Sequence, residues 1–316
     1  MADLDVATSE NDIEQSIAQV YIQILYAAES VKVNENTLQV SEAQRDRGKQ
    51  LLDAGSIARS DYAQLEAQVS TDRYQLVTAQ ATLQDYKLQL KQLLELDGEQ
   101  EMQVYLPALG DENVLSPLPT KTDVFRSAVA LRPEIEASKL SVEASELGIG
   151  IAKSGYLPSV SLTAGIGTNH TSGSDFTFGE QVKNGWNNSI GLSISVPIFN
   201  NRQTKSAVEK AKLQYQTSQL TLLDEQKTLY KTIEGLWLDA NSAQQRYAAA
   251  IEKLHSTQTS YELVSEQFNA GMKNTVELLT EKNNLLQAQQ ELLQSKYMAI
   301  LNTQLLKFYQ GDKITL

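Results

Sequence analysis

Two short stretches, 216 residues apart, decide the fold of this chain. They are Leu52-Asp53-Ala54-Gly55-Ser56-Ile57-Ala58-Arg59-Ser60-Asp61 and Phe268-Asn269-Ala270-Gly271-Met272-Lys273-Asn274-Thr275-Val276-Glu277. In each, an Ala-Gly pair follows a long helical pattern, and an acidic residue stands six positions after the glycine, where the next helical pattern begins. Glycine can adopt the left-handed conformation that closes a helix, and an acid is favourable in the first turn of the next one. Each stretch therefore predicts the tight turn of an antiparallel helical hairpin.

The same offset of 216 relates the helices on both sides of the two turns. Ile17 matches Ile233, Leu38 matches Leu254, and Val69 matches Leu285. Before the first turn, apolar residues recur at alternating steps of three and four, and the polar Asn34 completes the one wider gap, a pattern typical of a coiled coil. These apolar residues are Ile13, Ile17, Val20, Ile24, Ala27, Val31 and Leu38. The repeat predicts two tandem coiled-coil hairpins.

Prolines and glycines divide the rest of the chain. Residues 1–95 are expected to form the first hairpin, a truncated first repeat, and residues 96–131, with Pro107, Pro117 and Pro119, a connector or equatorial region. Residues 132–316 are expected to form the second repeat. It would contain a helix starting at Pro133, strands at about 157–167 and 187–198, and a coiled-coil hairpin over 201–310.

Between Ser159 and Gly167 and between Ser189 and Val196, the two expected strands alternate between aliphatic and small polar residues, and neither stretch carries a charge. The aliphatic positions are Val160, Leu162 and Ile166 in the first strand and Ile190, Leu192, Ile194 and Val196 in the second. One interpretation is a surface β-hairpin with one face packed on helices. The other is a strand pair for a transmembrane β-barrel, in which apolar side chains face lipid. Because lipid does not tolerate an open sheet edge, several chains would then have to close the barrel together.

Composition removes most other classes of protein. The absence of cysteine excludes disulfides and thiolate chemistry, and the two histidines, His170 and His255, have no partner at metal-ligand spacing. A formal net charge of −12 argues against a nucleic-acid partner. No nucleotide-binding loop or hydrolase motif is present, and acidic pairs such as Glu134/Glu136 are typical of a solvated helix face. We therefore expect no enzyme, no cofactor and no metal.

The sequence as a whole resembles the TolC-type outer-membrane efflux proteins, the outer membrane factors of tripartite efflux pumps. The resemblance rests on Leu131-Arg132-Pro133-Glu134-Ile135, on Tyr156-Leu157-Pro158-Ser159-Val160-Ser161-Leu162, on Gly191-Leu192-Ser193-Ile194-Ser195-Val196-Pro197-Ile198-Phe199-Asn200, and on the two turns. It implies a mainly α fold, in which long antiparallel coiled-coil hairpins form an α-barrel segment and one strand pair joins a transmembrane β-barrel shared among protomers.

The resemblance also implies a function and partners. The expected function is that of a passive exit duct for small molecules such as drugs, in the outer membrane of a Gram-negative bacterium and extending into the periplasm. The expected partners are two further copies in a homotrimer, a periplasmic adaptor (membrane fusion protein), an inner-membrane efflux transporter of the RND type, and outer-membrane lipid.

The same resemblance assigns roles at the turns. Adaptor docking is expected at Gly55, Ser56, Ile57, Arg59, Gly271, Met272, Lys273 and Thr275. A periplasmic aperture is expected at Glu277, with Asp61 as its repeat partner, and at Phe268. The alternative for Asp61 and Glu277 is that they are ordinary first-turn acids, favoured there by the helix dipole.

One departure from the family pattern is large. By the repeat offset, residues 132–216 should have an upstream copy, and both that copy and a signal peptide are missing. Three such chains would supply six strands, fewer than the roughly eight of the smallest single-chain barrels. We expect the chain to be a fragment. The competing hypothesis is a soluble coiled-coil scaffold, which the acidity and the missing signal favour and which the strand alternation and the repeat disfavour.

Overall fold

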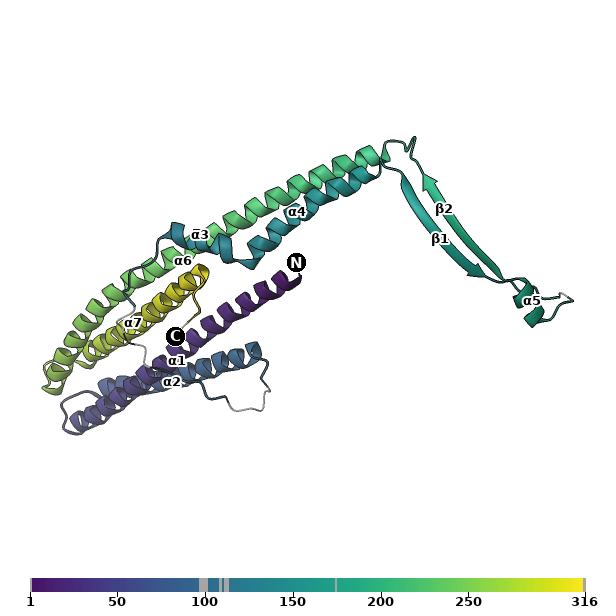
Figure 1. Ribbon diagram of the computed structural model, residues 1–316. Coiled ribbons are helices and arrows are strands. Elements are labelled where there is room, and N and C mark those ends of the chain that lie inside the picture. Colours follow the sequence, from purple (N-terminus) through teal and green to yellow (C-terminus); the bar gives the residue numbers. More distant parts are fainter. Residues whose placement is uncertain (1, 97–101, 108–109, 111–113, 174, 315–316) are drawn as a thin grey trace. The chain divides into compact units, whose positions relative to one another are not determined.

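The computed structural model describes residues 2–96, 102–107, 110, 114–173 and 175–314. Helices dominate, and the described strands form one two-stranded sheet (Figure 1). The chain divides into two compact units: the first contains residues 1–136 and 226–316, and the second contains residues 137–225.

The first unit contains the first predicted hairpin, made by α1 (Ala2–Asp53) and α2 (Arg59–Leu93). The coiled-coil positions Ile24, Ala27 and Val31 are buried, and so is Asn34, the polar residue of the seam, whose side-chain amide donates to the Ser30 carbonyl at 2.7 Å. Burying this apolar face, rather than intrinsic helix propensity, is what stabilises helices of this kind.

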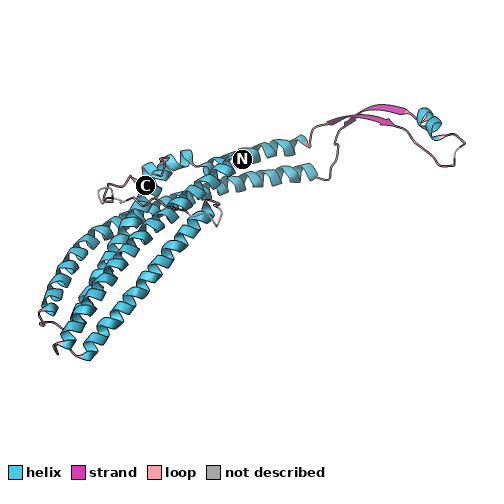
Figure 2. Cartoon of the chain, turned by 90° about the horizontal axis from the view of Figure 1, so that it is seen from below, coloured by secondary structure: helices cyan, strands magenta, loops and turns pink. Residues whose placement is uncertain are grey.

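The rest of the first unit is formed by α3 (Lys121–Leu131), the start of α4 (Pro133–Ser154), the later part of α6 (Gln203–Asn269) and α7 (Thr275–Gln310). Helix α7 packs against α1, α2 and α3, and a core of Ile22, Leu25 and Tyr297 joins α1 to α7. The second hairpin, α6 and α7, thus packs on the first (Figure 2).

Side chains of α6 donate hydrogen bonds to backbone carbonyls of the connector and so attach the connector to this helix. The Trp237 indole N–H donates to the Pro119 carbonyl at 3.0 Å, and the Gln244 amide donates to the carbonyls of Val114 and Ser116 at 2.8 Å. Parts of the expected connector, residues 97–101, 108–109 and 111–113, lie outside the described residues.

The second unit contains the strand pair. Strands β1 (Ser159–Gly167) and β2 (Asn187–Ser195) pair antiparallel, with Val160 opposite Ile194 and Leu162 opposite Leu192. Both strands are shorter than expected, because the prolines at 158 and 197 cannot donate to a ladder. Val196 consequently lies one residue beyond β2.

The segment between the strands contains a short helix that the sequence patterns did not predict, α5 (Phe178–Asn184). The Glu180 carboxylate at its third position accepts from the Thr177 N–H at 2.9 Å and from the Thr177 hydroxyl at 2.7 Å, which fixes the start of the helix. None of the helices in the described part of the chain combines the length and the apolar character needed to cross a membrane.

Candidate functional site

The two predicted turns have the same backbone geometry. Gly55 and Gly271 adopt φ values of +74° and +76°, the left-handed conformation that glycine tolerates best. In the first turn the Ser56 N–H donates to the Leu51 carbonyl at 2.8 Å, and in the second the Met272 N–H donates to the Gln267 carbonyl at 2.8 Å. Together with a second bond from each glycine N–H, this is the Schellman motif, which satisfies the last carbonyls of a helix.

A shared apolar core holds the two turns at the same end of the first unit (Figure 2). Its buried members are Leu65 of α2, Phe268 of α6 and Leu278 of α7, with Leu51 of α1 packed at the side. Each of the four helices that end or begin at a turn thus contributes a side chain. The structure therefore brings the two predicted turns together as one surface.

The acid six residues after each glycine caps the N-terminus of the next helix. The Asp61 carboxylate accepts from the Ala58 N–H at 3.2 Å, and the Glu277 carboxylate accepts from the Asn274 N–H at 3.2 Å. The Asn274 side chain in turn accepts from the Glu277 N–H at 2.9 Å, which completes a capping box in the second hairpin.

Glu277 has an additional partner that Asp61 lacks. Lys273 donates to the Glu277 carboxylate at 2.5 Å, and the repeat counterpart of Lys273 is the apolar Ile57. The hydrogen bond from Lys273, followed by that from the Asn274 backbone, lowers the pKa of the Glu277 carboxyl below its usual value. These contacts are those expected of an ordinary acid in the first turn of a helix, the alternative to a role in the aperture.

The expected docking residues differ in their accessibility. Gly55, Ser56, Arg59, Gly271 and Met272 are exposed, Met272 by 71%, whereas Ile57 and Lys273 are half-buried.

Two of the residues expected to form the docking surface and the aperture have buried side chains. Thr275 is only 1% exposed, so its side chain is not available to a docking partner. Phe268 is 3% exposed and belongs to the core beneath the turns. Spacing in the sequence does not predict this burial, because it depends on how the two hairpins pack.

The sheet of the second unit is exposed on both faces along its whole length. Its aliphatic side chains, together with Val196 just beyond β2, are between 59% and 84% exposed: Val160, Leu162, Ile166, Ile190, Leu192, Ile194 and Val196. Cross-strand pairing places Leu162 opposite Leu192 and Ser161 opposite Ser193, whereas Ile166 lies opposite Asn188. The strand pair therefore has one mainly aliphatic face, on which Asn188 is the polar exception, and one face of small polar residues, and neither is covered by the described residues.

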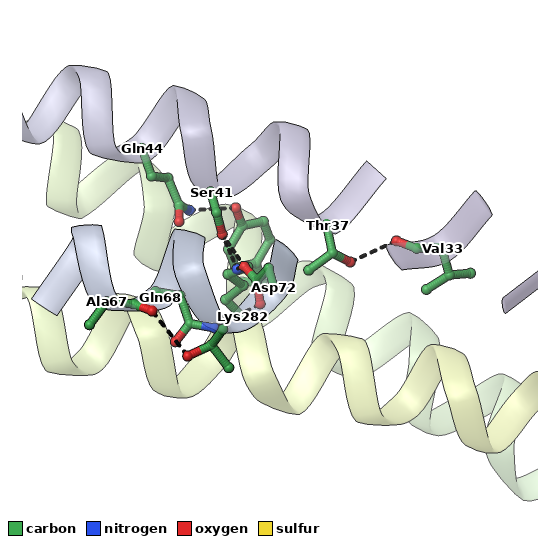
Figure 3. A network of polar contacts seen from close by, with 10 residues as sticks. Val33, Thr37, Ser41, Gln44, Ala67, Gln68, Asp72 and Lys282 are labelled. Atoms are coloured by element: carbon green, nitrogen blue, oxygen red, sulfur yellow. Dashed lines mark hydrogen bonds and ion pairs between the residues drawn. The ribbon is translucent and has the colours of Figure 1, made fainter. Parts of the chain in front are cut away.

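Sequence patterns gave no sign of a buried polar cluster between the hairpins (Figure 3). Lys282 of α7 donates to the Asp72 carboxylate of α2 and to the Ser41 hydroxyl of α1, and Ser41 also donates to Asp72. The Gln68 amide donates to the other Asp72 oxygen at 2.9 Å. Asp72 is 1% and Lys282 3% exposed. Burial lowers the pKa of the Lys282 ammonium, and the hydrogen bond and charge of Asp72 offset only part of that effect.

Comparison with known proteins identifies the family. The model of the family described as "Outer membrane efflux protein" matches residues 124–311, more than half of the chain. The chain belongs to the outer membrane efflux protein family. This membership places it among outer-membrane proteins rather than enzymes.

Individual relatives agree with that assignment. Outer membrane protein TolC of Escherichia coli (strain K12) is 25% identical over 313 residues, which cover 95% of this chain and 61% of TolC. Outer membrane efflux protein BepC of Brucella suis is 24% identical over 294 residues, which cover 92% of this chain and 61% of BepC. The chain thus spans about 61% of the length of these relatives.

Solved structures agree on the fold. A crystal structure of CusC superimposes with a TM-score of 0.83 at 19% identity, covering 98% of this chain and 70% of CusC. The outer-membrane channel OprN superimposes with a TM-score of 0.81 at 19% identity, covering 99% of this chain and 69% of OprN.

Proposed function

We propose that this family member forms part of a passive exit duct in the outer membrane of a Gram-negative bacterium, through which small molecules such as drugs leave the cell. Three copies together form the duct, and the strand pair of each contributes to a barrel in the membrane. The helical hairpins form the periplasmic part, and residues 96–131 are the connector between the two repeats.

One observation carries this proposal: the uncovered aliphatic face of the strand pair. Seven large aliphatic side chains exposed side by side are unfavourable in water and favourable in lipid. The opposite face is lined by serine, threonine and glycine together with Asn187, which suits a water-filled interior. The outward edges of β1 and β2 have no partner strand among the described residues. In lipid those edges need partners, which further copies would supply.

We further propose that the paired turns dock a periplasmic adaptor, which opens the duct together with an inner-membrane transporter of the RND type. Support comes from the rigidity and exposure of this surface. Two Schellman turns are fixed on one apolar core, and Met272 is an exposed apolar side chain beside an exposed glycine. The half-buried Ile57 and Lys273 complete the surface, and Asp61 and Glu277 fix the helices behind it.

The test of the membrane role uses two neighbouring residues of β2 that point to opposite faces. Leu192→Lys places a charge on the aliphatic face, at a cost of about 2–4 kcal/mol at the centre of a bilayer. Ser193→Lys, its matched control, places the same charge on the polar face. In the full-length protein, we expect Leu192→Lys to reduce the amount of folded protein in outer membranes and Ser193→Lys to leave it nearly unchanged. Equal amounts of both variants would contradict the proposal.

A further inference from the structure

Basic side chains gather where the strand pair joins its two helices. These residues, called the basic cluster below, are all exposed: Lys153 in the last turn of α4, and Arg202, Lys205, Lys210 and Lys212 at the start of α6. Glu209 is the one acidic residue in this part of the sequence, and α6 has no acid in its first turn. The chain as a whole, in contrast, has a formal net charge of −12. The junction is therefore a local concentration of positive charge in an acidic protein.

The basic cluster lies at one end of the strand pair only (Figure 1). Strand β1 begins opposite the end of β2, so the connections to α4 and α6 share one end of the sheet. There the Thr204 hydroxyl of α6 donates to the Gly155 carbonyl just after α4, at 3.3 Å. The segment 168–186, at the other end, has two acidic residues and one lysine. The strand pair thus separates a basic end from an end without excess positive charge.

Acidic side chains do not neutralise the basic cluster. Lys212 donates to the Glu209 carboxylate at 2.9 Å, and this hydrogen bond and the charge of Lys212 lower the pKa of the Glu209 carboxyl below its usual value. Arg202, Lys205 and Lys210 form no ion pair with any residue that the structure describes. Together with Glu209, these three side chains line an open groove of about 490 Å³ along α6. The groove therefore presents cations that lack a partner of opposite charge in the described chain.

Large apolar side chains lie between the strands and the basic cluster. Ile198 is 95% and Phe199 85% exposed in the connection from β2 to α6, and Tyr156 is 55% exposed in the connection from α4 to β1. The order from the sheet outward is thus aliphatic, then aromatic and aliphatic, then basic. This order is typical of the edge of a bilayer, where aromatic rings lie at the headgroup level and long basic side chains reach the phosphates.

The chemistry of the whole surface selects among the anions that could pair with the basic cluster. A free anion would account for the cations in the groove, but it would leave Ile198 and Phe199 in water. An anionic phospholipid supplies both a charged headgroup and apolar surroundings. Clusters of Lys and Arg next to a membrane-spanning segment attract such lipids.

We propose that the basic cluster binds the headgroups of anionic phospholipids in the membrane leaflet next to the helices. This inference rests on the proposed function, which places the strand pair in the outer membrane. Arg202, Lys205 and Lys210 bind the phosphates from the groove on α6, and Lys153 adds its charge from α4. Because charged side chains enter hydrocarbon only at a high cost, this contact also fixes how deeply the strands lie in the bilayer.

The experiment measures which lipid lies next to a chosen residue. This chain contains no cysteine, so one introduced cysteine carries a fluorophore in full-length protein that has no other cysteine. Phe199→Cys reports on the basic cluster, Leu192→Cys on the aliphatic face, and Phe178→Cys on the other end of the strand pair. Vesicles of phosphatidylethanolamine contain a small, equal fraction of nitroxide-labelled phosphatidylglycerol or nitroxide-labelled phosphatidylethanolamine. The ratio of quenching by the two labelled lipids measures the local enrichment of the anionic lipid.

The unaltered cluster should enrich the anionic lipid at one end only. With the label at Phe199→Cys, we expect phosphatidylglycerol to quench several-fold more strongly than phosphatidylethanolamine at low salt. With the label at Phe178→Cys, we expect no preference. Sodium chloride should weaken the preference at Phe199→Cys, because salt screens exposed charges.

Charge variants test whether the groove is responsible. The triple variant Arg202→Gln, Lys205→Gln and Lys210→Gln should abolish the preference for phosphatidylglycerol at the label on residue 199. The matched control, Lys227→Gln with Lys231→Gln, removes exposed charges of the same helix far from the strands and should leave the preference unchanged. A preference that survives the triple variant would overturn the inference.

The remaining outcomes separate this inference from the proposed function. If both lipids quench Leu192→Cys but Phe199→Cys shows no preference, the strand pair lies in the membrane and the lipid-binding inference is wrong. If neither lipid quenches Leu192→Cys, the proposed function fails and the inference fails with it. If sodium phosphate abolishes the preference at an ionic strength at which chloride does not, the groove binds a free anion instead of lipid. The two salt series use the unaltered cluster, so they decide the question even where the triple variant folds poorly.

Discussion

Gly48 of α1 lies so close to Leu65 of α2 that a Cβ atom added at Gly48 would overlap with Leu65 Cδ1. Leu65 is almost fully buried in the core beneath the turns, so its side chain has little room to move away. The missing side chain at position 48 thus allows α2 to approach α1 just before the first turn.

Gly48→Ala should therefore destabilise the end of the first hairpin. Overpacking costs about 1–3 kcal/mol, and the better helix propensity of alanine offsets about 1 kcal/mol of this. The matched control is Gly235→Ala in α6, where no atom lies within 4 Å of the added Cβ and a gain of about 1 kcal/mol is expected. Chemical denaturation should give a lower free energy of unfolding for Gly48→Ala and a higher one for Gly235→Ala than for the parent. Two stabilised variants would contradict the close approach.

Substitution at the turn glycines tests the left-handed conformation separately from packing. No atom lies within 4 Å of an added Cβ at Gly55 or Gly271, so only backbone strain opposes Gly55→Ala or Gly271→Ala. This strain is about 1–2 kcal/mol, and asparagine, which tolerates this conformation, should cost less. Amide hydrogen exchange across each turn should be faster in the alanine variants and intermediate in the asparagine variants. Unchanged exchange in the alanine variants would be inconsistent with the positive φ values.

Glu277 predicts a pH dependence at the second turn. The pKa of Glu277 is lowered in the folded chain, so the ionised carboxylate stabilises the start of α7. This stabilisation is fully present at pH values above the usual carboxyl pKa of about 4.3. It is lost as the pH falls through the lowered pKa of the folded chain. Exchange at residues 275–278, corrected for the intrinsic rate, should accelerate in acid. Glu277→Gln keeps an acceptor for the Asn274 N–H but has no charge for Lys273, so its profile should be flatter. Identical pH profiles of exchange in Glu277→Gln and in the parent would show that the Lys273–Glu277 ion pair does not stabilise the start of α7.

The proposed docking surface predicts a loss of transport without a loss of folding. Met272→Asp places a charge on an exposed apolar side chain. In a strain that depends on the full-length protein, it should reduce efflux of a fluorescent dye while leaving the amount of protein in the outer membrane unchanged. The control is Val276→Asp, one turn away on α7 and also exposed. Equal efflux in both variants and the parent would count against docking through Met272.

The sequence predicted those parts of the structure that depend on local patterns. The glycine turns and the strand alternation follow from spacing within a few dozen residues, and the two hairpins follow from the constant offset of 216. The strand ends were less well predicted, because the expected ranges included Pro158 and Pro197, which lie outside both strands. The ion pair between Asp72 and Lys282 could not be predicted, because its partners are 210 residues apart and their approach depends on hairpin packing. For the same reason, Thr275 and Phe268 were expected at the surface, although both are buried by contacts between helices.

The most direct test of the central claim is the location and assembly of the full-length protein in fractionated cells. An exit duct predicts a trimer in the outer-membrane fraction whose migration changes on heating, because heating separates and unfolds a closed assembly. A dimer recovered in the soluble fraction would contradict the duct and would support the coiled-coil scaffold.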